Sequence, residues 1–298
     1  MKCDFTIAPT YAPLLLISKY HVNLGSRVFR LVRSGQNALL QFIDNIRPDW
    51  IVLSLADIKS AVPAIRQSAQ DLLSHSSEAG INVLMDSGGL ERHQMPAEYF
   101  QDPCCFDRPL TNLREHFSLS SVPAMVTLLD DLRLPSPLRA LLEIDNELVH
   151  EIETGRIKNT KILLVIHESD LPTIPLLQAS ELLGVIDDIA LAERELASAS
   201  LQKIPMLLRR GLVVFGVDDL SLCGLRHCLQ FGAYLGDSMA WLTRRLTSAD
   251  WKVSTHHDHW KVWDDSWCGL PEERLTELLY ENLLFLKETE RRLVQETN

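Results

Sequence analysis

Short apolar runs recur along the chain, and segments with helical periodicity separate most of them. The apolar runs are nearly continuous, which is typical of strands buried on both faces of a parallel sheet. This alternation predicts an α/β protein in which helices wrap a parallel sheet. The predicted strands are Leu14–Ser18, Trp50–Leu55, Ile81–Asp86, Met125–Asp130, Ile162–His167, Ile186–Glu193, Leu212–Val217 and Tyr234–Asp237.

The segments between these strands predict the helices. They are Gln36–Ile46, Ile58–His75, Pro137–Glu153, Ile174–Leu183, Leu201–Arg209, Leu220–Phe231 and Ser238–Leu246. Eight strand–helix units predict a closed TIM (β/α)8 barrel over residues 1–250. Residues 251–298 are predicted to form a C-terminal extension, in which Pro271 opens a long amphipathic helix. Phe5–Ala8 is an equally good candidate for the first strand, and pairing of the two as a hairpin is open.

Composition narrows the class of protein. The 298 residues are 46% hydrophobic and 23% charged, which is ordinary for a soluble globular protein, and no apolar run is long enough to span a bilayer. The first residues lack the basic region and the cleavage site of a signal peptide. We therefore expect a cytoplasmic protein with no membrane partner. The six cysteines show neither the paired spacing of a metal-binding motif nor the regular spacing of a disulfide-rich secreted protein, so reduced thiols are expected.

The charge balance bears on nucleic-acid binding. Forty acidic against twenty-nine basic residues give a formal charge of −11, which disfavours a broad phosphate-neutralising surface. A local basic patch is still compatible with this charge, although solvated helix faces show the same pattern. The candidates are Arg27, Arg30 and Arg33, then Arg209 and Arg210, and Arg244 and Arg245.

Two aspartates close buried runs in similar settings. Asp86-Ser87-Gly88-Gly89 ends the third predicted strand, and Asp237 ends the last, within Gly232-Ala233-Tyr234-Leu235-Gly236-Asp237-Ser238. Two such carboxylates suit glycosidic-bond chemistry, in which one attacks the anomeric carbon and the other handles protons. Asp-Ser-Gly-Gly also surrounds the nucleophilic serine of chymotrypsin-like proteases, but their all-β fold conflicts with the α/β pattern. A glycine pair after a strand is also found in simple tight turns.

Other polar residues share this position at a strand end. The catalytic groups of a TIM barrel lie at the carboxyl ends of its strands, so the polar residues there are expected to lie together at one end of the barrel. Each could instead cap the following helix. The residues concerned are Asp86, Asp130, His167, Glu193 and Asp237.

Together with Gly216-Val217-Asp218-Asp219-Leu220, the two aspartate segments resemble the tRNA-guanine transglycosylase superfamily, which includes enzymes that insert 7-deazaguanine bases into tRNA or DNA. The resemblance spans residues 49–298. It implies that Asp237 is the nucleophile that displaces the base, that Asp86 is the general acid/base, and that Asp130 binds the base edge. Ser87, Gly88 and Gly89 are then expected beside the base. A carboxylate suits Asp130 because guanine presents adjacent N–H donors to one acceptor.

The chain departs from the family in two segments of the base pocket. His167-Glu168-Ser169 replaces the family's Gln-Gly-Gly after strand five, and Ala192-Glu193-Arg194 replaces its Gly-Gly-Leu after strand six. We expect His167 and Glu193 to line a remodelled base pocket. Glu193 could accept a hydrogen bond from an exocyclic amine. In the alternative interpretation, Glu193 and Arg194 pair with each other or with Glu195.

The family's zinc cluster of three cysteines and a histidine is missing, with Cys268 standing alone. His256, His257 and His259 could form a substitute site with Cys268, but a solvated loop is favoured because their spacing is irregular. We therefore expect no metal and no cofactor. The loss weakens the expectations of polynucleotide binding and of the homodimer that family members form near this module.

The leading hypothesis is a pentosyltransferase that exchanges a guanine-type base for a 7-deazaguanine-type base in nucleic acid, through a covalent glycosyl-aspartate intermediate. Its partners would be tRNA or DNA, with the target base unpaired or flipped, and a free purine or 7-deazapurine base. One alternative is a nucleosidase or base exchange on free nucleosides, favoured by the acidic charge and the missing zinc module. The other is a non-catalytic partner subunit of a transglycosylase, which retention of both aspartates disfavours.

Overall fold

The computed structural model describes residues 6–9, 50–157, 159–216 and 233–238 of the chain. Contacts divide the chain into two compact units, residues 53–213 in one, and residues 1–52 with 214–298 in the other. The helices predicted at Gln36–Ile46 and Leu220–Phe231 lie outside the described residues, as does the predicted C-terminal extension, residues 251–298. Of the helix predicted from Ser238 to Leu246, only Ser238 is described, as the last residue of a strand.

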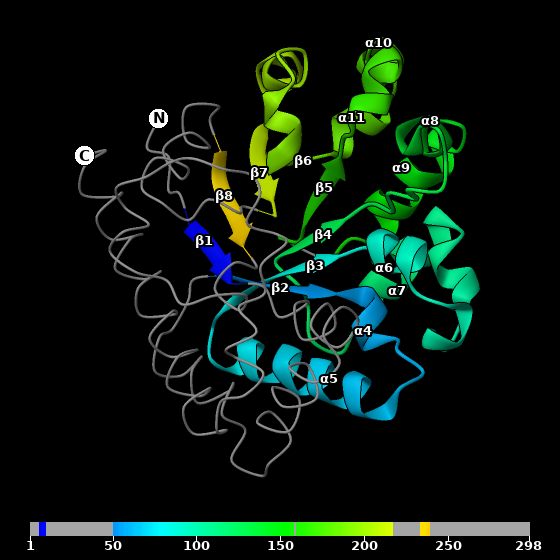
Figure 1. The fold of residues 1–298 in the computed structure, drawn as a ribbon, viewed down its shortest axis with the longest axis vertical. Helices are drawn as coiled ribbons and strands as arrows, with labels where there is room; N and C mark the ends of the chain where they lie inside the picture. The colour runs from blue at the N-terminus through cyan, green and yellow to red at the C-terminus, as the bar shows by residue number, and fades with distance from the viewer. Residues whose placement is uncertain (1–5, 10–49, 158, 217–232, 239–298) are drawn as a thin grey trace, which may run out of the picture. The chain divides into compact units, whose positions relative to one another are not determined.

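The strands are parallel and follow one another in sequence order. β3 pairs with β4, β4 with β5 and β5 with β6, and the order is consecutive from β2 to β7 (Figure 1). This confirms the predicted α/β class, since consecutive parallel strands separated by helices are the arrangement of a (β/α) barrel. The strands are β1 Thr6–Pro9, β2 Trp50–Ser54, β3 Asn82–Asp86, β4 Met125–Thr127, β5 Lys161–Val165, β6 Asp188–Ala192, β7 Gly211–Phe215 and β8 Ala233–Ser238.

The first strand forms near the alternative position, Phe5–Ala8, whereas Leu14–Ser18 lies outside the described residues. β1 pairs in parallel with β8. Both strands belong to the compact unit formed by residues 1–52 and 214–298, whereas β3 to β6 belong to the unit formed by residues 53–213. In this register Asp237 lies opposite Ala8, one residue before β8 ends. The backbone thus places the predicted nucleophile at the carboxyl end of a strand, as the sequence predicted.

Helices connect the strands, and several are shorter than predicted. Proline opens α5, α7 and α8 at the first turn, where its missing N–H costs no helical hydrogen bond. The predicted start of the helix Ile58–His75 is wrong, because Ile58 ends α4 and α5 begins only at Pro63. The predicted helix Pro137–Glu153 is divided into two helices, α8 and α9. The α-helices are α4 Leu55–Ile58, α5 Pro63–Glu78, α6 Gly89–Gln94, α7 Pro109–Phe117, α8 Pro137–Leu142, α9 Asp145–Gly155, α10 Ile174–Ala179, α11 Leu182–Val185 and α12 Ile204–Leu208.

Two short 3-10 helices, η3 and η4, follow the strands β5 and β6. Ile186–Glu193 was predicted as one strand, but β6 ends at Ala192 and Glu193 begins the 3-10 helix η4. The 3-10 helices are η1 Ala97–Tyr99, η2 Pro103–Phe106, η3 Glu168–Thr173, η4 Glu193–Ala197 and η5 Leu201–Lys203.

The strands supply much of the core. Adjacent residues Leu163 and Leu164 of β5 are both fully buried, although their side chains point to opposite faces of the sheet. The same holds for Ile189 and Ala190 of β6, so both faces of these strands are covered, as the continuous apolar runs predicted. None of the described helices has the length and apolar character needed to cross a membrane.

Candidate functional site

The carboxyl ends of β3 and β4 hold Asp86 in place. The Ser87 N–H donates to Thr127 Oγ1 at 2.6 Å, and the Thr127 hydroxyl donates to Asp86 Oδ1 at 3.3 Å. The Gly88 N–H donates to the other carboxylate oxygen, Oδ2, at 3.2 Å. Because Asp86 ends β3 and Thr127 ends β4, the pairing of these strands fixes the orientation of the Asp86 carboxylate.

Ser87 links Asp86 and Thr127 to Asp130. Its side chain is fully buried, its hydroxyl donates to Asp130 Oδ1 at 2.7 Å, and its oxygen accepts the Gly89 N–H at 3.2 Å. The Asn112 amide of α7 donates to the Ser87 carbonyl at 3.0 Å. A protease nucleophile would instead donate its proton to a histidine. Ser87 therefore acts as a scaffold for Asp130, and the contacts of this residue do not support the protease reading.

The two glycines allow the loop to approach Asp130. Gly88 has φ +80°, and a Cβ there would lie 2.8 Å from the Phe106 ring and 2.9 Å from the Ala56 Cβ. A Cβ on Gly89 would lie 2.3 Å from the Asp130 carbonyl oxygen and 2.7 Å from its Oδ1. All four distances are shorter than real Cβ contacts, so this loop requires glycine at both positions.

His167, at the end of β5, lies between two carboxyl groups. Its Nδ1 is 3.1 Å from Glu195 Oε1, and its Nε2 is 3.5 Å from Asp130 Oδ2. The first distance is that of a hydrogen bond, whereas the second is long for one and is better described as an ion pair. The side chains of His167, Asp130 and Glu195 are only 13%, 13% and 12% exposed. Hydrogen bonds thus join the predicted residues Asp86, Ser87 and Asp130, and an ion pair adds His167 to this network. Thr127 and Glu195 are members that the sequence did not indicate.

The charges around His167 decide its protonation. Burial by itself would lower its pKa, but hydrogen bonding to Asp130 and Glu195, and their charges, outweigh burial and raise the pKa of His167 to about 10. Burial would raise the pKa of Glu195, but the contact with His167 and the Ala192 N–H, which donates at 3.2 Å, lower it overall. At neutral pH the ring is therefore an imidazolium.

We expect the His167 ring to stay protonated in titrations followed by histidine NMR until the pH approaches about 10. Because the folded pKa exceeds the ordinary value of 6.5, this interaction stabilises the fold fully below pH 6.5 and is lost as the pH rises through about 10. Glu195→Gln should lower the midpoint, since one of the two stabilising charges is removed. A midpoint that is the same in both proteins would show that Glu195 does not hold the proton on His167.

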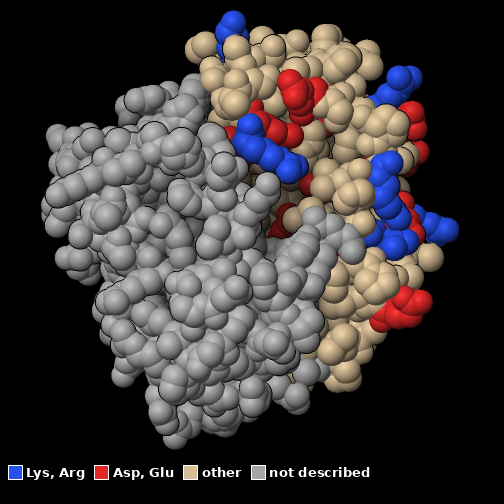
Figure 2. Space-filling view, in the orientation of Figure 1, with Lys and Arg blue, Asp and Glu red and all other residues tan. Residues whose placement is uncertain are grey.

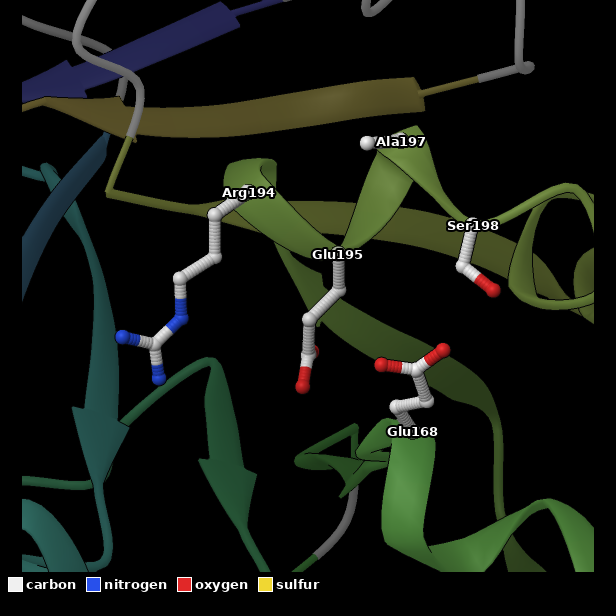
Figure 3. A pocket seen from close by; sticks show the side chains of 5 residues that line it. All are labelled: Glu168, Arg194, Glu195, Ala197 and Ser198. Atoms are coloured by element: carbon white, nitrogen blue, oxygen red, sulfur yellow. The ribbon is translucent and has the colours of Figure 1, made fainter.

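A pocket of about 490 Å³ adjoins this network and is lined by Glu168, Arg194, Glu195, Ala197 and Ser198. Glu195 of η4 and Glu168 of η3 point into the same space, and Arg194, also in η4, extends alongside Glu195 (Figure 3). Glu193 is half-buried and does not line this pocket; the carboxylate that contacts both His167 and the pocket is Glu195.

The other predicted site residues lie in the C-terminal part of the chain. Asp237 is placed by its backbone alone, and His256, His257, His259 and Cys268 lie outside the described residues. Within the ranges that the structure describes, no group of three or more histidine, cysteine, aspartate or glutamate side chains could hold a metal ion.

Basic residues form no broad surface on the visible face of the described part, where they are interspersed with acidic ones (Figure 2). Arg210, one of the candidate patch residues, donates from Nη2 to the Leu183 carbonyl at 2.6 Å, so it serves the fold. Arg209 caps α12 in the left-handed conformation, and the other candidate arginines lie outside the described residues.

No family model matches the chain, and no curated protein sequence matches it. Among solved structures, the chain is similar to a candidate fructose-1,6-biphosphate aldolase from Coccidioides immitis, with 13% identity, a TM-score of 0.49, and coverage of 98% of this chain and 92% of the other. It is also similar to a GH26-CBM35 β-(1,4)-mannanase from Podospora anserina, with 13% identity and a TM-score of 0.39, over 66% of this chain and 54% of the mannanase. Likenesses at these values do not indicate an activity.

Proposed function

We propose that the chain is a transglycosylase that exchanges a guanine-type base in nucleic acid for a 7-deazaguanine-type base. The observation that carries this proposal is the network in which Ser87 and Thr127 join Asp86 to Asp130, with His167 alongside, at the carboxyl ends of adjacent strands. Catalysis by a positioned carboxyl group requires such orientation before the substrate arrives. The family resemblance, which rests on sequence, supplies the nucleophile, Asp237.

The chemistry of the network suits the edge of guanine. Guanine presents a carbonyl oxygen as acceptor next to N–H donors, whereas adenine presents an amine at the corresponding position. Asp130 offers acceptor oxygens, and His167 Nε2, which is buried, makes no short hydrogen bond among the described residues, so its imidazolium proton is not committed to another acceptor. An acceptor beside a cationic donor favours guanine-type bases over adenine.

In the proposed reaction, an Asp237 carboxylate oxygen forms a bond to the anomeric carbon while the N-glycosidic bond breaks. The electron pair of that bond goes to the ring nitrogen of the departing base, and Asp86 supplies the proton that neutralises it. The ring nitrogen of the incoming base then attacks the same carbon, its proton passes to Asp86, and the Asp237 carboxylate is released.

A nucleosidase acting on free nucleosides is the second candidate. The observation in its favour is the interspersed charge on the visible face of the described part, because polynucleotide binding draws much of its affinity from basic side chains (Figure 2). In this reaction water would take the place of the incoming base.

Incubation with labelled guanine and tRNA, duplex DNA or free guanosine tests the proposal. We expect label to enter one of the two polymers, and Asp130→Asn to reduce the rate by roughly 10- to 100-fold, because an acceptor oxygen becomes a donor facing the N–H groups of the base. Asp131→Asn is the matched control, since this neighbouring carboxylate pairs with Arg133 at 2.6 Å and lies outside the network. Hydrolysis of guanosine without label uptake would support the nucleosidase. Absence of reaction with all three substrates would leave the partner-subunit hypothesis.

A further inference from the structure

Asp57 carries a buried carboxyl group close to the residues that bind the Asp86 carboxylate. It lies in α4, directly after β2, and is 4% exposed. Gly88 lies close to both aspartates: a Cβ added to it would lie 2.9 Å from the Cβ of Ala56, the residue before Asp57, and its N–H donates to the Asp86 carboxylate. Glu91 of α6, 5% exposed, and Tyr99 of η1, 6% exposed, complete this cluster.

The basic side chains of the surrounding elements are engaged elsewhere. Lys59, which caps α4, pairs with Glu115, Arg66 of α5 donates to the Ser60 carbonyl at 2.6 Å, and Arg92 of α6 binds Asp107 at 2.8 Å. Within the described ranges, Asp57 Oδ1 and the Tyr99 hydroxyl have no hydrogen-bond partner. A buried carboxylate without a counter-charge is costly, whereas the neutral acid carries a much smaller penalty.

Electrostatics lead to the same conclusion. Burial, followed by the charges of Glu91 and Asp86, raises the pKa of Asp57 well above its ordinary value of 3.8, and the nearby Tyr99 hydroxyl offsets only part of this. Burial, and then the charge of Asp57, also raises the pKa of Tyr99, so its hydroxyl keeps its proton.

We propose that Asp57 is a neutral carboxylic acid at neutral pH and serves as a positioning residue for Asp86. A neutral Asp57 lets Asp86 give up its proton beside Glu91 without a third adjacent negative charge. An ionised Asp57 would hold the proton on Asp86 and so oppose its return to the carboxylate form. The role toward Asp86 rests on the proposed function, whereas the protonation of Asp57 does not.

Infrared difference spectroscopy of the full chain tests the protonation directly. At neutral pH we expect the carbonyl band of a carboxylic acid in the unmodified protein, and its loss in Asp57→Asn. Asp170→Asn is the matched control, because Asp170 is equally buried but accepts hydrogen bonds from Ser136 at 2.6 Å, Leu138 at 3.1 Å and His167 at 3.0 Å. The band should persist in Asp170→Asn. An unchanged band in Asp57→Asn would overturn the proposal.

The pH dependence of unfolding gives an independent measurement. Because the folded pKa of Asp57 is raised, its stabilising contribution is full below pH 3.8 and declines as the pH rises through the folded value. In urea titrations, the unfolding free energy of the unmodified protein minus that of Asp57→Asn should therefore decrease from acidic to alkaline pH. A difference that does not change with pH would contradict a proton held by Asp57.

The role toward Asp86 is read from the pH profile of base exchange. We expect the kcat/KM of Asp57→Asn to change little from neutral to alkaline pH, whereas the kcat/KM of the unmodified protein should fall over this range as Asp57 ionises. Superimposable profiles would overturn the positioning role. If the unmodified protein shows no exchange, the proposed function fails, and the infrared and unfolding results still decide whether Asp57 holds a proton.

Discussion

Asp237→Asn should abolish the covalent protein–nucleic acid adduct and lower kcat by a factor on the order of 10⁴ or more. The amide keeps the size of the carboxylate but is a far poorer nucleophile, so the chain should still fold and bind the base. Denaturing electrophoresis, after incubation with nucleic acid and a base analogue that stalls turnover, detects the adduct directly. The backbone register with β1 supports this choice, since Asp237 lies at the carboxyl end of β8.

Asp86→Asn is the comparison variant for this experiment. It removes the proton carrier while leaving the nucleophile, so we expect slower exchange and weaker base binding. An adduct that persists in Asp237→Asn and disappears only in Asp86→Asn would reverse the two roles. A nucleic acid that turns over with the unmodified protein but yields no adduct would remove support for the covalent mechanism.

Gly89→Ala should destabilise the fold by about 1–3 kcal/mol or more and should weaken base binding as well. The added Cβ would lie 2.3 Å from the Asp130 carbonyl oxygen, which is backbone and cannot rotate away as a flexible side chain could. Relief of the clash must move Asp130, and with it the contacts to Ser87 and His167. Chemical denaturation measures the first effect, and calorimetry with guanine measures the second.

Gly184→Ala is the control for that substitution. Gly184 lies in α11, and a Cβ there meets nothing within 4 Å. Alanine should leave stability unchanged or raise it by about 0.5–1 kcal/mol, because it is the better helix former. Equal losses in the two variants would show that the loop around Gly89 tolerates a side chain and that the close approach to Asp130 is not required.

The strands were the most predictable part of the fold, because a strand covered on both faces leaves a continuous apolar run. β3, β5 and β7 lie within one or two residues of their predicted ends. The helices were less predictable because short elements carry little periodicity. α6 and α7 were not predicted, and the helix predicted over Pro137–Glu153 breaks between α8 and α9, whose first residue, Asp145, accepts N–H groups of Glu181 and Leu182.

For the site, the sequence indicated residues with obvious chemistry at strand ends, and the structure brings Asp86, Asp130 and His167 together. The sequence did not distinguish Glu195 from Glu193, because the 3-10 turn of η4 leaves no periodic signal in the sequence. This turn presents the Glu195 carboxylate to His167. Thr127 was hidden as a polar residue inside an apolar run. Its link to Asp86 depends on the alignment of β3 with β4, which local sequence does not reveal.

The pairing of β1 with β8 bears on the order in which a nascent chain acquires its parts. Leu235 leaves the ribosome long after its partner Thr6, because the two residues are far apart in the sequence. β3 to β6 pair with their neighbours in sequence, and such local contacts form sooner than distant ones. A growing chain should therefore form the contacts that link Asp86 to Asp130 before Asp237 is synthesised. Under the proposed function, affinity for the base would then precede the ability to cleave it from the sugar.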